Sequence, residues 1–444
     1  MRKEKIIIAG YFAVVIILAA VAGIGRNLSV YADISAGTAR FPVVLAALLA
    51  GVIVMFYALK HTPSRKWVYA GAIFAAFIFL FLPPIASGDA LTSLFRVKIF
   101  GITRLNPYLV APSQFPGDSW PMGGSWRHIP MPYGPLWVIF SIIFIPFIKF
   151  NSVAVALIFY KLTLSAMAIF AGRLLYRIAS EIGTDGRKAE LLFLWNPLVL
   201  LTVFSDSHND MAMLFLFLPA LYFLLKENFR LSLLALAASA LVKYVAILAL
   251  PFFILHIFRR TGNVKKTAKA MIPSLIFPFI AFLPFWKGAE IFRGLFLASS
   301  IISPNSFIVH SGNLLGAKIY FYDGLKPWIW GIALILIGAV FCWSAKGEGR
   351  IIKGIILVFF IAAMSLTELF NWYLLWPLIL FPLVYEPKWK MFLLYVTFFG
   401  VLHIDWRFWK SAVWALILSL ALTVLDERKE KIRQLCQSKV FGKL

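Results

Sequence analysis

The segment "SDSHND", residues 205–210, places two carboxylates and an imidazole between runs of leucine, valine and phenylalanine. His208 can donate a hydrogen bond to a phosphate, or act as an acid or base near neutral pH. Asn209 and Asp210 can instead cap the next helix, which is the structural alternative. Zinc is weakly supported, because Asp206, His208 and Asp210 alternate but no second histidine is nearby. The segment is a candidate functional site at the end of an apolar run.

Two further charges stand out against apolar surroundings. Asp89 opens "DALTSLFRV", and on a helix Arg96 would lie seven residues on, on the same face. The alternative is an ordinary polar helix start with Asp89 as its N-cap. Lys243 lies inside the apolar run "SALVKYVAILALP". It either reaches an interface with its ammonium group or meets a buried anion.

Aromatic residues accompany these charges. The stretches "RLNPYLVAPSQFPGD" and "RHIPMPYGPLW" form stiff turns whose rings could stack on sugars, and "TELFNWYLLWPL" adds a second polar rim. The alternative is the aromatic belt of any membrane surface. The residues concerned are Tyr108, Trp120, Trp126, Tyr133, Trp137, Glu368, Asn371, Trp372, Tyr373 and Trp376.

The elements that would hold these residues are membrane helices. Of 444 residues 61% are hydrophobic and only 14% are charged. Apolar runs of about 20 residues recur, the length a helix needs to cross a bilayer. The net charge of +24 does not indicate nucleic acid, because lysine and arginine concentrate in loops expected on one side. We predict an all-α, polytopic, integral membrane protein.

The apolar runs predict about 12–14 crossings. Spans are expected near 6–24, 41–59, 67–84, 152–172, 189–206, 210–225, 268–286, 327–343, 351–368, 372–386, 389–404 and 410–426. The run 231–258 is broken at Lys243 and Pro251, and we expect two half-length helices that form a hairpin. The run after Pro135 is expected to lie in the interface or to re-enter. The first run is expected to be a retained span and not a cleaved signal peptide.

The distribution of positive charge predicts cytoplasmic N- and C-termini. Loop 85–133, the turn 205–210 and loop 287–326 then share the outer face. The whole chain, 1–444, is expected to form one transmembrane domain, with spans in 6–84, an outer loop region in 85–150, a helical bundle in 151–426 and a basic cytoplasmic tail in 427–444. Within the outer loop, "ALTSLFRVKIFG" is expected to form an interfacial amphipathic helix.

The order of the motifs resembles that of a known family. "SGD" after a span, then "NPY", "YGPL", "WNPL…SHND", "LVKY" and "NWYLLWPL" follow one another over about 85–385. This order resembles the integral-membrane GT-C glycosyltransferases, and among them the prokaryotic polyprenyl-phosphate-mannose-dependent mannosyltransferases. The chain departs from their pattern at Ser207, where the family commonly has glycine. It also has two extra spans before the loop that carries Asp89, and lacks the Tyr and Gly-Arg pair that often follow this Asp.

The resemblance implies a transferase of the outer membrane face. Such enzymes pass a sugar from a polyprenyl phosphate to an acceptor hydroxyl, usually with inversion at the anomeric carbon. The family's base maps onto Asp89, and mannose is the first expectation for the sugar. The acceptor is a glycan, a lipid or a protein. Metal is not implied, although two carboxylates leave a divalent cation open, and no other cofactor is expected.

The remaining polar residues receive roles within this scheme. Arg96, His208 and Lys243 are candidates to stabilise the departing phosphate. Asp206, Asn209 and Asp210 are candidates to bind sugar hydroxyls or to orient His208. Tyr133, Trp372 and Tyr373 are candidates to stack on the sugar or guide the prenyl chain. The main alternative function is a transporter or flippase of a lipid-linked saccharide, and a third is a non-catalytic membrane scaffold.

Overall fold

The computed structural model describes residues 2–23, 41–118, 120, 125–149, 152–300, 325–343, 348–366, 369–384 and 387–402. All regular structure in these residues is helical, which confirms the predicted all-α class. The expected span at 410–426, the basic tail and Glu368 lie outside the described residues.

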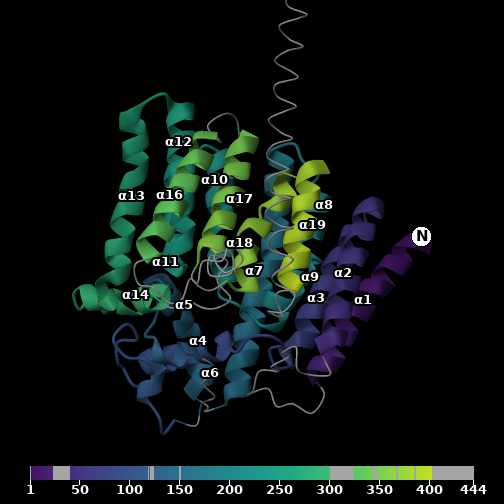
Figure 1. The fold of residues 1–444 in the computed structure, drawn as a ribbon, viewed down its shortest axis with the longest axis horizontal. Coiled ribbons are helices and arrows are strands. Elements are labelled where there is room, and N and C mark those ends of the chain that lie inside the picture. Colours follow the sequence, from purple (N-terminus) through teal and green to yellow (C-terminus); the bar gives the residue numbers. More distant parts are fainter. Residues whose placement is uncertain are drawn as a thin grey trace, which may run out of the picture.

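Long helices stand side by side in a bundle (Figure 1). Their bounds are α1 Arg2–Gly23, α2 Phe41–His61, α3 Arg65–Leu80, α7 Val153–Glu181, α10 Asp210–Leu225, α11 Phe229–Val242, α12 Leu250–Thr261, α13 Val264–Phe282, α16 Leu325–Trp343, α17 Glu348–Ser365 and α19 Pro387–Leu402. In the described part, five helices are long and apolar enough to cross a membrane, or six if one bent pair is a single span.

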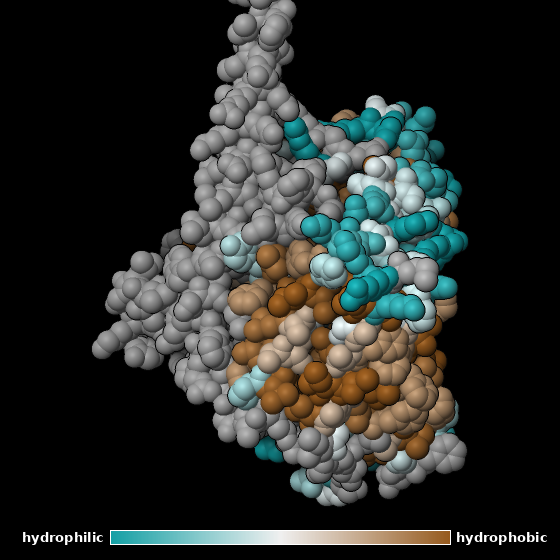
Figure 2. Space-filling view, turned by 90° about the vertical axis from the view of Figure 1, so that its right-hand side faces the viewer, coloured by the Kyte–Doolittle hydropathy of each residue, from teal (hydrophilic) through white to brown (hydrophobic). Residues whose placement is uncertain are grey.

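The surface of the bundle supports a membrane location. A hydrophobic band crosses the face shown in Figure 2, and hydrophilic residues gather above it. At this side of the bundle Ile53 of α2 is 70% exposed, and at the opposite side in Figure 1 Phe279 of α13 is 77% exposed. Large apolar groups so exposed on helices of membrane-spanning length are expected to contact lipid tails. The chain is therefore an integral membrane protein.

The predicted break at Lys243 is present. α11 ends at Val242, Lys243 is extended (φ −144°, ψ 121°), and the 3₁₀ helix η5 (Tyr244–Ala249) leads into α12. α11 runs antiparallel to α10, since Ser232 Oγ donates to Ala220 O and Ser239 Oγ donates to Met213 O. α12 then runs back toward its turn with α13 (Figure 1). The run is thus divided in two at Lys243 as expected, but only α11 is short: the second arm, Tyr244–Thr261, is long and apolar enough to cross a membrane, so the expected half length is wrong for it.

Shorter helices lie beneath the bundle in Figure 1 and include α4 (Asp89–Gly101), α5 (Pro135–Ser141) and α6 (Ile145–Lys149). The run after Pro135 is thus a set of short pieces. α4 is the helix predicted in the outer loop, but most of its side chains are buried. It is therefore an internal helix and not an amphipathic helix on the membrane surface, because both the bundle and the following loop cover it.

Candidate active site

A cavity of about 330 Å³ lies where α4, η5, α17 and the segment around Trp372 meet. Predicted site residues from three distant parts of the sequence line it: Asp89, Tyr133, Lys243, Trp372 and Tyr373. Val245, Ile247 and Leu248 of η5 form an apolar part of its wall, together with Ala362 and Leu366. The cavity therefore combines a small polar region with an extended apolar one.

Asp89 presents a carboxylate to this cavity. It is the first residue of α4 and Gly88 is the N-cap, so the alternative that Asp89 caps its own helix is wrong. Its side chain is 28% exposed, and Oδ2 lies 3.7 Å from His208 Nδ1. Burial raises the pKa of Asp89 to about 6, although Arg96 and Lys243 oppose the shift. A carboxylate with this pKa is mostly ionised at neutral pH and is suited to accept a proton.

His208 lies behind Asp89 and not on the cavity wall. Its ring stacks on Trp372, with centroids 3.8 Å apart and planes inclined by 17°. Burial, followed by the nearby charge of Lys243, lowers the pKa of His208 well below its usual value. Its Nε2 has no hydrogen-bond partner in the described part of the chain. The imidazole is therefore uncharged near neutral pH, and it lies close to Asp89 without a hydrogen bond to it.

Lys243 meets a buried anion, which decides between the two alternatives for this residue. Its Nζ lies 2.8 and 2.7 Å from the carboxylate oxygens of Asp210. The same carboxylate accepts a hydrogen bond of 2.5 Å from Trp376 Nε1. The rings of Tyr133 and Tyr373 lie 5.5 and 5.0 Å from the ammonium nitrogen. Asp210 thus holds the cation between aromatic rings at the cavity wall.

The other predicted polar residues lie behind the wall. Asp206 accepts hydrogen bonds from the backbone N–H groups of Ile85 (2.6 Å) and Ala86 (3.1 Å). Arg96 donates to the carbonyl oxygens of Trp126 and Ile129, at 2.9 and 3.1 Å. These two side chains hold backbone segments around the cavity, and the predicted contacts with sugar or phosphate stay predictions.

Asn209 is buried, and its Nδ2 has no hydrogen-bond partner among the residues that the structure describes. Asn209 is the N-cap residue of α10, as the capping alternative expected, but its side chain makes no cap hydrogen bond. Within the described ranges, no three His, Cys, Asp or Glu side chains converge on one point.

The "WNPL" motif explains how the chain reaches this site. Asn196 accepts a hydrogen bond from Leu198 N–H (2.9 Å), and Pro197 begins α9 (Pro197–Val199). α8 (Gly186–Leu194) and the following helix are bent by 43° at this point. The π-helical turn Leu200–Ser205 then ends at Asp206.

Ser207 has a left-handed backbone with φ +57°. Glycine adopts this conformation most readily. The glycine that is common at this position in the family would therefore be less strained here than Ser207. The Ser207 hydroxyl donates to Val203 O at 3.1 Å.

Sequence reasoning missed Lys161, which lies near this region on α7. Its side chain is fully buried, and Nζ donates to the carbonyl oxygens of Phe79 and Leu82. The signal that singled out Lys243, a lysine inside an apolar run, was also present in "ALIFYKLTLSAM".

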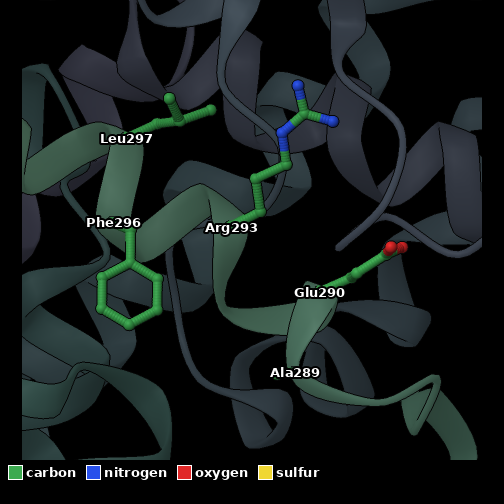
Figure 3. Close-up of a pocket in the computed structure, with 5 residues that line it drawn as sticks. All are labelled: Ala289, Glu290, Arg293, Phe296 and Leu297. Carbon is green, nitrogen blue, oxygen red and sulfur yellow. The ribbon is translucent and has the colours of Figure 1, made fainter.

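A second hollow lies on the neighbouring elements η7 (Ala289–Phe292) and α14 (Arg293–Ser300). Its volume is about 480 Å³, and Ala289, Glu290, Arg293, Phe296 and Leu297 line it (Figure 3). None of the predicted site residues lies there. The chemically suited groups gather in the first cavity.

Comparisons with known proteins agree with the motif order. Residues 7–259 match the family model described as "Alpha-(1->6)-mannopyranosyltransferase, N-terminal domain". A curated protein named Alpha-(1->6)-mannopyranosyltransferase A from Mycobacterium tuberculosis (strain ATCC 25618 / H37Rv) is 26% identical over 297 residues. That match covers 62% of this chain and 57% of the relative.

A protein of the same name from Corynebacterium glutamicum is 22% identical over 326 residues, which cover 66% of each chain. The matches thus cover 57% and 66% of these two relatives' own lengths.

Proposed function

The chain belongs to the family described as Alpha-(1->6)-mannopyranosyltransferase, N-terminal domain, and from this premise we propose that it is a membrane glycosyltransferase. It moves a sugar, with mannose as the first expectation, from a polyprenyl-phosphate donor to an acceptor hydroxyl. The reaction takes place at the outer face of the cell membrane. The names of both relatives support mannose as the sugar.

The observation that carries this proposal is the position of Asp89. Its carboxylate lines the cavity, and its contact with a titratable group in the described residues is the uncharged imidazole of His208, 3.7 Å away. Asp210, by contrast, is fully buried and already binds Lys243 and Trp376. Asp89 is thus the carboxylate left available to a substrate, as a general base must be.

The reaction is a single displacement. The acceptor hydroxyl attacks the anomeric carbon, the bond from this carbon to the phosphate oxygen breaks, and the phosphate keeps the electron pair. Asp89 takes the hydroxyl proton, and the ammonium of Lys243 stabilises the charge on the departing phosphate. A single displacement inverts the anomeric centre, so an α linkage requires a β-linked sugar phosphate as donor.

The apolar wall of the cavity supports a lipid-linked donor. Ile247 of η5 lines the cavity and is 46% exposed, and Leu248 and Leu366 continue the apolar surface. A prenyl chain that entered beside η5 would stay in contact with apolar groups while its phosphate reached Lys243. The distribution of lysine and arginine supports an outer location for this end of the bundle, where a lipid carrier can deliver an activated sugar.

The test is sugar transfer by the purified protein in nanodiscs. Radiolabelled polyprenyl-phosphate mannose, glucose or arabinose is offered with a lipid and glycan extract as the source of acceptor. We expect transfer from the mannose donor, and its loss by a factor of about 10² or more in Asp89→Asn, which cannot accept the proton. Glu290→Gln, a carboxylate change in the second hollow, is the matched control and should keep wild-type transfer.

Two results would contradict this function. Transfer that survives unchanged in Asp89→Asn would exclude Asp89 as the base. Donor binding without transfer, equal in the wild type and in Asp89→Asn, combined with movement of the donor across the bilayer, would favour the flippase alternative.

A further inference from the structure

Lys161 is a buried lysine inside the membrane-spanning helix α7. Its side chain has no exposed surface, and Nζ donates to Phe79 O (2.9 Å) and Leu82 O (2.7 Å). These carbonyls belong to the last turn of α3 and the residues after it, where the regular backbone donors of a helix end. Phe79 O also accepts a hydrogen bond from Leu82 N–H at 3.3 Å. Lys161 thus attaches α7 to the C-terminal end of α3.

Asp206, at the end of the π-helical turn Leu200–Ser205, binds the next residues of this segment, Ile85 and Ala86. It is 1% exposed, and its carboxylate accepts hydrogen bonds from the N–H groups of Ile85 and Ala86. Ser205 Oγ adds to this contact, since it donates to Asp206 and lies 3.3 Å from Ile85 N. The acceptors at 79 and 82 and the donors at 85 and 86 are therefore bound by side chains of opposite charge.

The segment held in this way leads directly to the cavity. Three residues after Ala86, Asp89 begins α4, and its N–H donates to Ser87 Oγ at 3.2 Å. Burying an ammonium and a carboxylate is unfavourable unless each is hydrogen-bonded and compensated. Apolar side chains would join α3 to α7 without that penalty. The arrangement therefore favours a role that requires a defined backbone position.

We propose that Lys161 and Asp206 are positioning residues that hold the segment 79–86 and thereby set the place of the Asp89 carboxylate in the cavity. This inference rests on the proposed function, because it assigns Asp89 the role of the base. It also gives Asp206 a role different from the predicted contact with sugar hydroxyls. Neither residue lines the cavity, so both act through Asp89.

Hydrogen–deuterium exchange of the full chain in nanodiscs measures the first part without any activity assay. The variants are Lys161→Met, Asp206→Asn and the double variant, which leaves no unpaired buried charge. We expect at least tenfold faster exchange in the peptide that contains Ile85 and Ala86. Lys161→Arg should restore slow exchange, because a guanidinium can also donate to two carbonyls.

Ser165→Ala is the matched control for these variants. Ser165 lies one turn further along α7, is buried, and its hydroxyl has no partner in the described part of the chain. Its exchange should equal that of the wild type. Unchanged exchange in both Lys161→Met and Asp206→Asn would overturn the proposal, whether or not the protein transfers a sugar.

Kinetics test the second part, the link to Asp89. A displaced base lowers kcat by about 10- to 100-fold with little change in KM for the donor, because Lys243 and the apolar wall are untouched. A looser segment also exposes Asp89 to water, so the acidic limb of the kcat profile should move from near pH 6 toward pH ~4. The titratable and charged groups that face Asp89 in the described residues are Arg96, Tyr133, Tyr160, His208, Asp210 and Lys243.

The outcomes separate this inference from the proposed function. Faster exchange together with a lower kcat and a shifted acidic limb supports both. Faster exchange with an unchanged kcat and pH profile shows a purely structural contact and overturns the positioning role. A wild type that transfers no sugar would contradict the proposed function, while the exchange experiment would still decide whether Lys161 and Asp206 hold the segment.

Discussion

Lys243 and Asp210 form a closed ion pair at the cavity wall, with both carboxylate oxygens within 2.8 Å of the ammonium nitrogen. Lys243 is 14% exposed and Asp210 is fully buried. The pair joins the extended residue after α11 to the first residue of α10. The Asp210 carboxylate thus fixes the position of the Lys243 ammonium group, which lines the cavity.

This pair predicts opposite results for stability and activity in a double-variant cycle. Lys243→Met leaves the Asp210 carboxylate buried without its cation, and should destabilise the fold by roughly 3–5 kcal/mol. Adding Asp210→Asn should recover most of this loss, because an amide carries no charge. Thermal unfolding in detergent measures both steps.

Transfer should not recover in the double variant. The cation that stabilises the phosphate is absent in both cases, so kcat should stay about 10²- to 10³-fold below wild type. If restored stability brought restored transfer, Lys243 would have a structural role alone, and another cation would have to meet the phosphate.

The pH dependence of transfer should follow Asp89. Burial raises the pKa of this carboxyl to about 6, and a general base is active only when it is ionised. kcat should therefore rise with pH through about 6 and reach a plateau near neutrality. His208 adds no acidic limb in this range, because its pKa is lowered well below the usual value.

His208→Gln is the control for this assignment, and it should keep a limb of the same sign. A limb that vanished in His208→Gln while Asp89 was intact would assign the titration to the imidazole instead.

Residues that the sequence revealed share one property, a charge in apolar surroundings. Asp89, His208 and Lys243 stand out for this reason, because such groups are costly in a membrane unless they have a role. Their contacts could not be predicted in the same way. Lys243 and Asp210 are 33 residues apart, and they meet because α10 and α11 pack antiparallel.

Arg96 shows why other assignments were out of reach. Its spacing from Asp89 predicted a shared helix face, which describes α4 correctly. Its partners, however, are carbonyls of the turn at Trp126 and Ile129, and no sequence pattern states the path of that loop. The contacts of Asp206 were equally unpredictable from the sequence, since its partners are backbone N–H groups 120 and 121 residues away.

Ser207 predicts a stability difference between two small substitutions. Its φ of +57° disfavours any residue with a Cβ by roughly 1–2 kcal/mol, and both Ser207→Gly and Ser207→Ala lose the hydroxyl bond to Val203. Ser207→Gly should therefore be more stable than Ser207→Ala by about 1 kcal/mol, measured as a higher melting temperature.

The reverse order is expected at Ser165 inside α7, where glycine is worse than alanine by about 0.5–1 kcal/mol. Equal stability of Ser207→Gly and Ser207→Ala would show that the turn relaxes out of the left-handed region.

Gly134 provides the last prediction, because it lets the loop approach α11 closely. Its N–H donates to Val242 O at 3.1 Å, and a Cβ at this position would lie 2.0 Å from Leu241 O. The obstacle is backbone, so Gly134→Ala must push the end of α11 away and move Lys243 with it. We expect a loss of roughly 1–3 kcal/mol in stability and a clear fall in transfer.

Gly117→Ala, where a Cβ meets no atom within 4 Å, is the control and should leave stability and transfer unchanged. Wild-type transfer in Gly134→Ala would show that the position of Lys243 tolerates this shift, and would weaken its assignment to the phosphate.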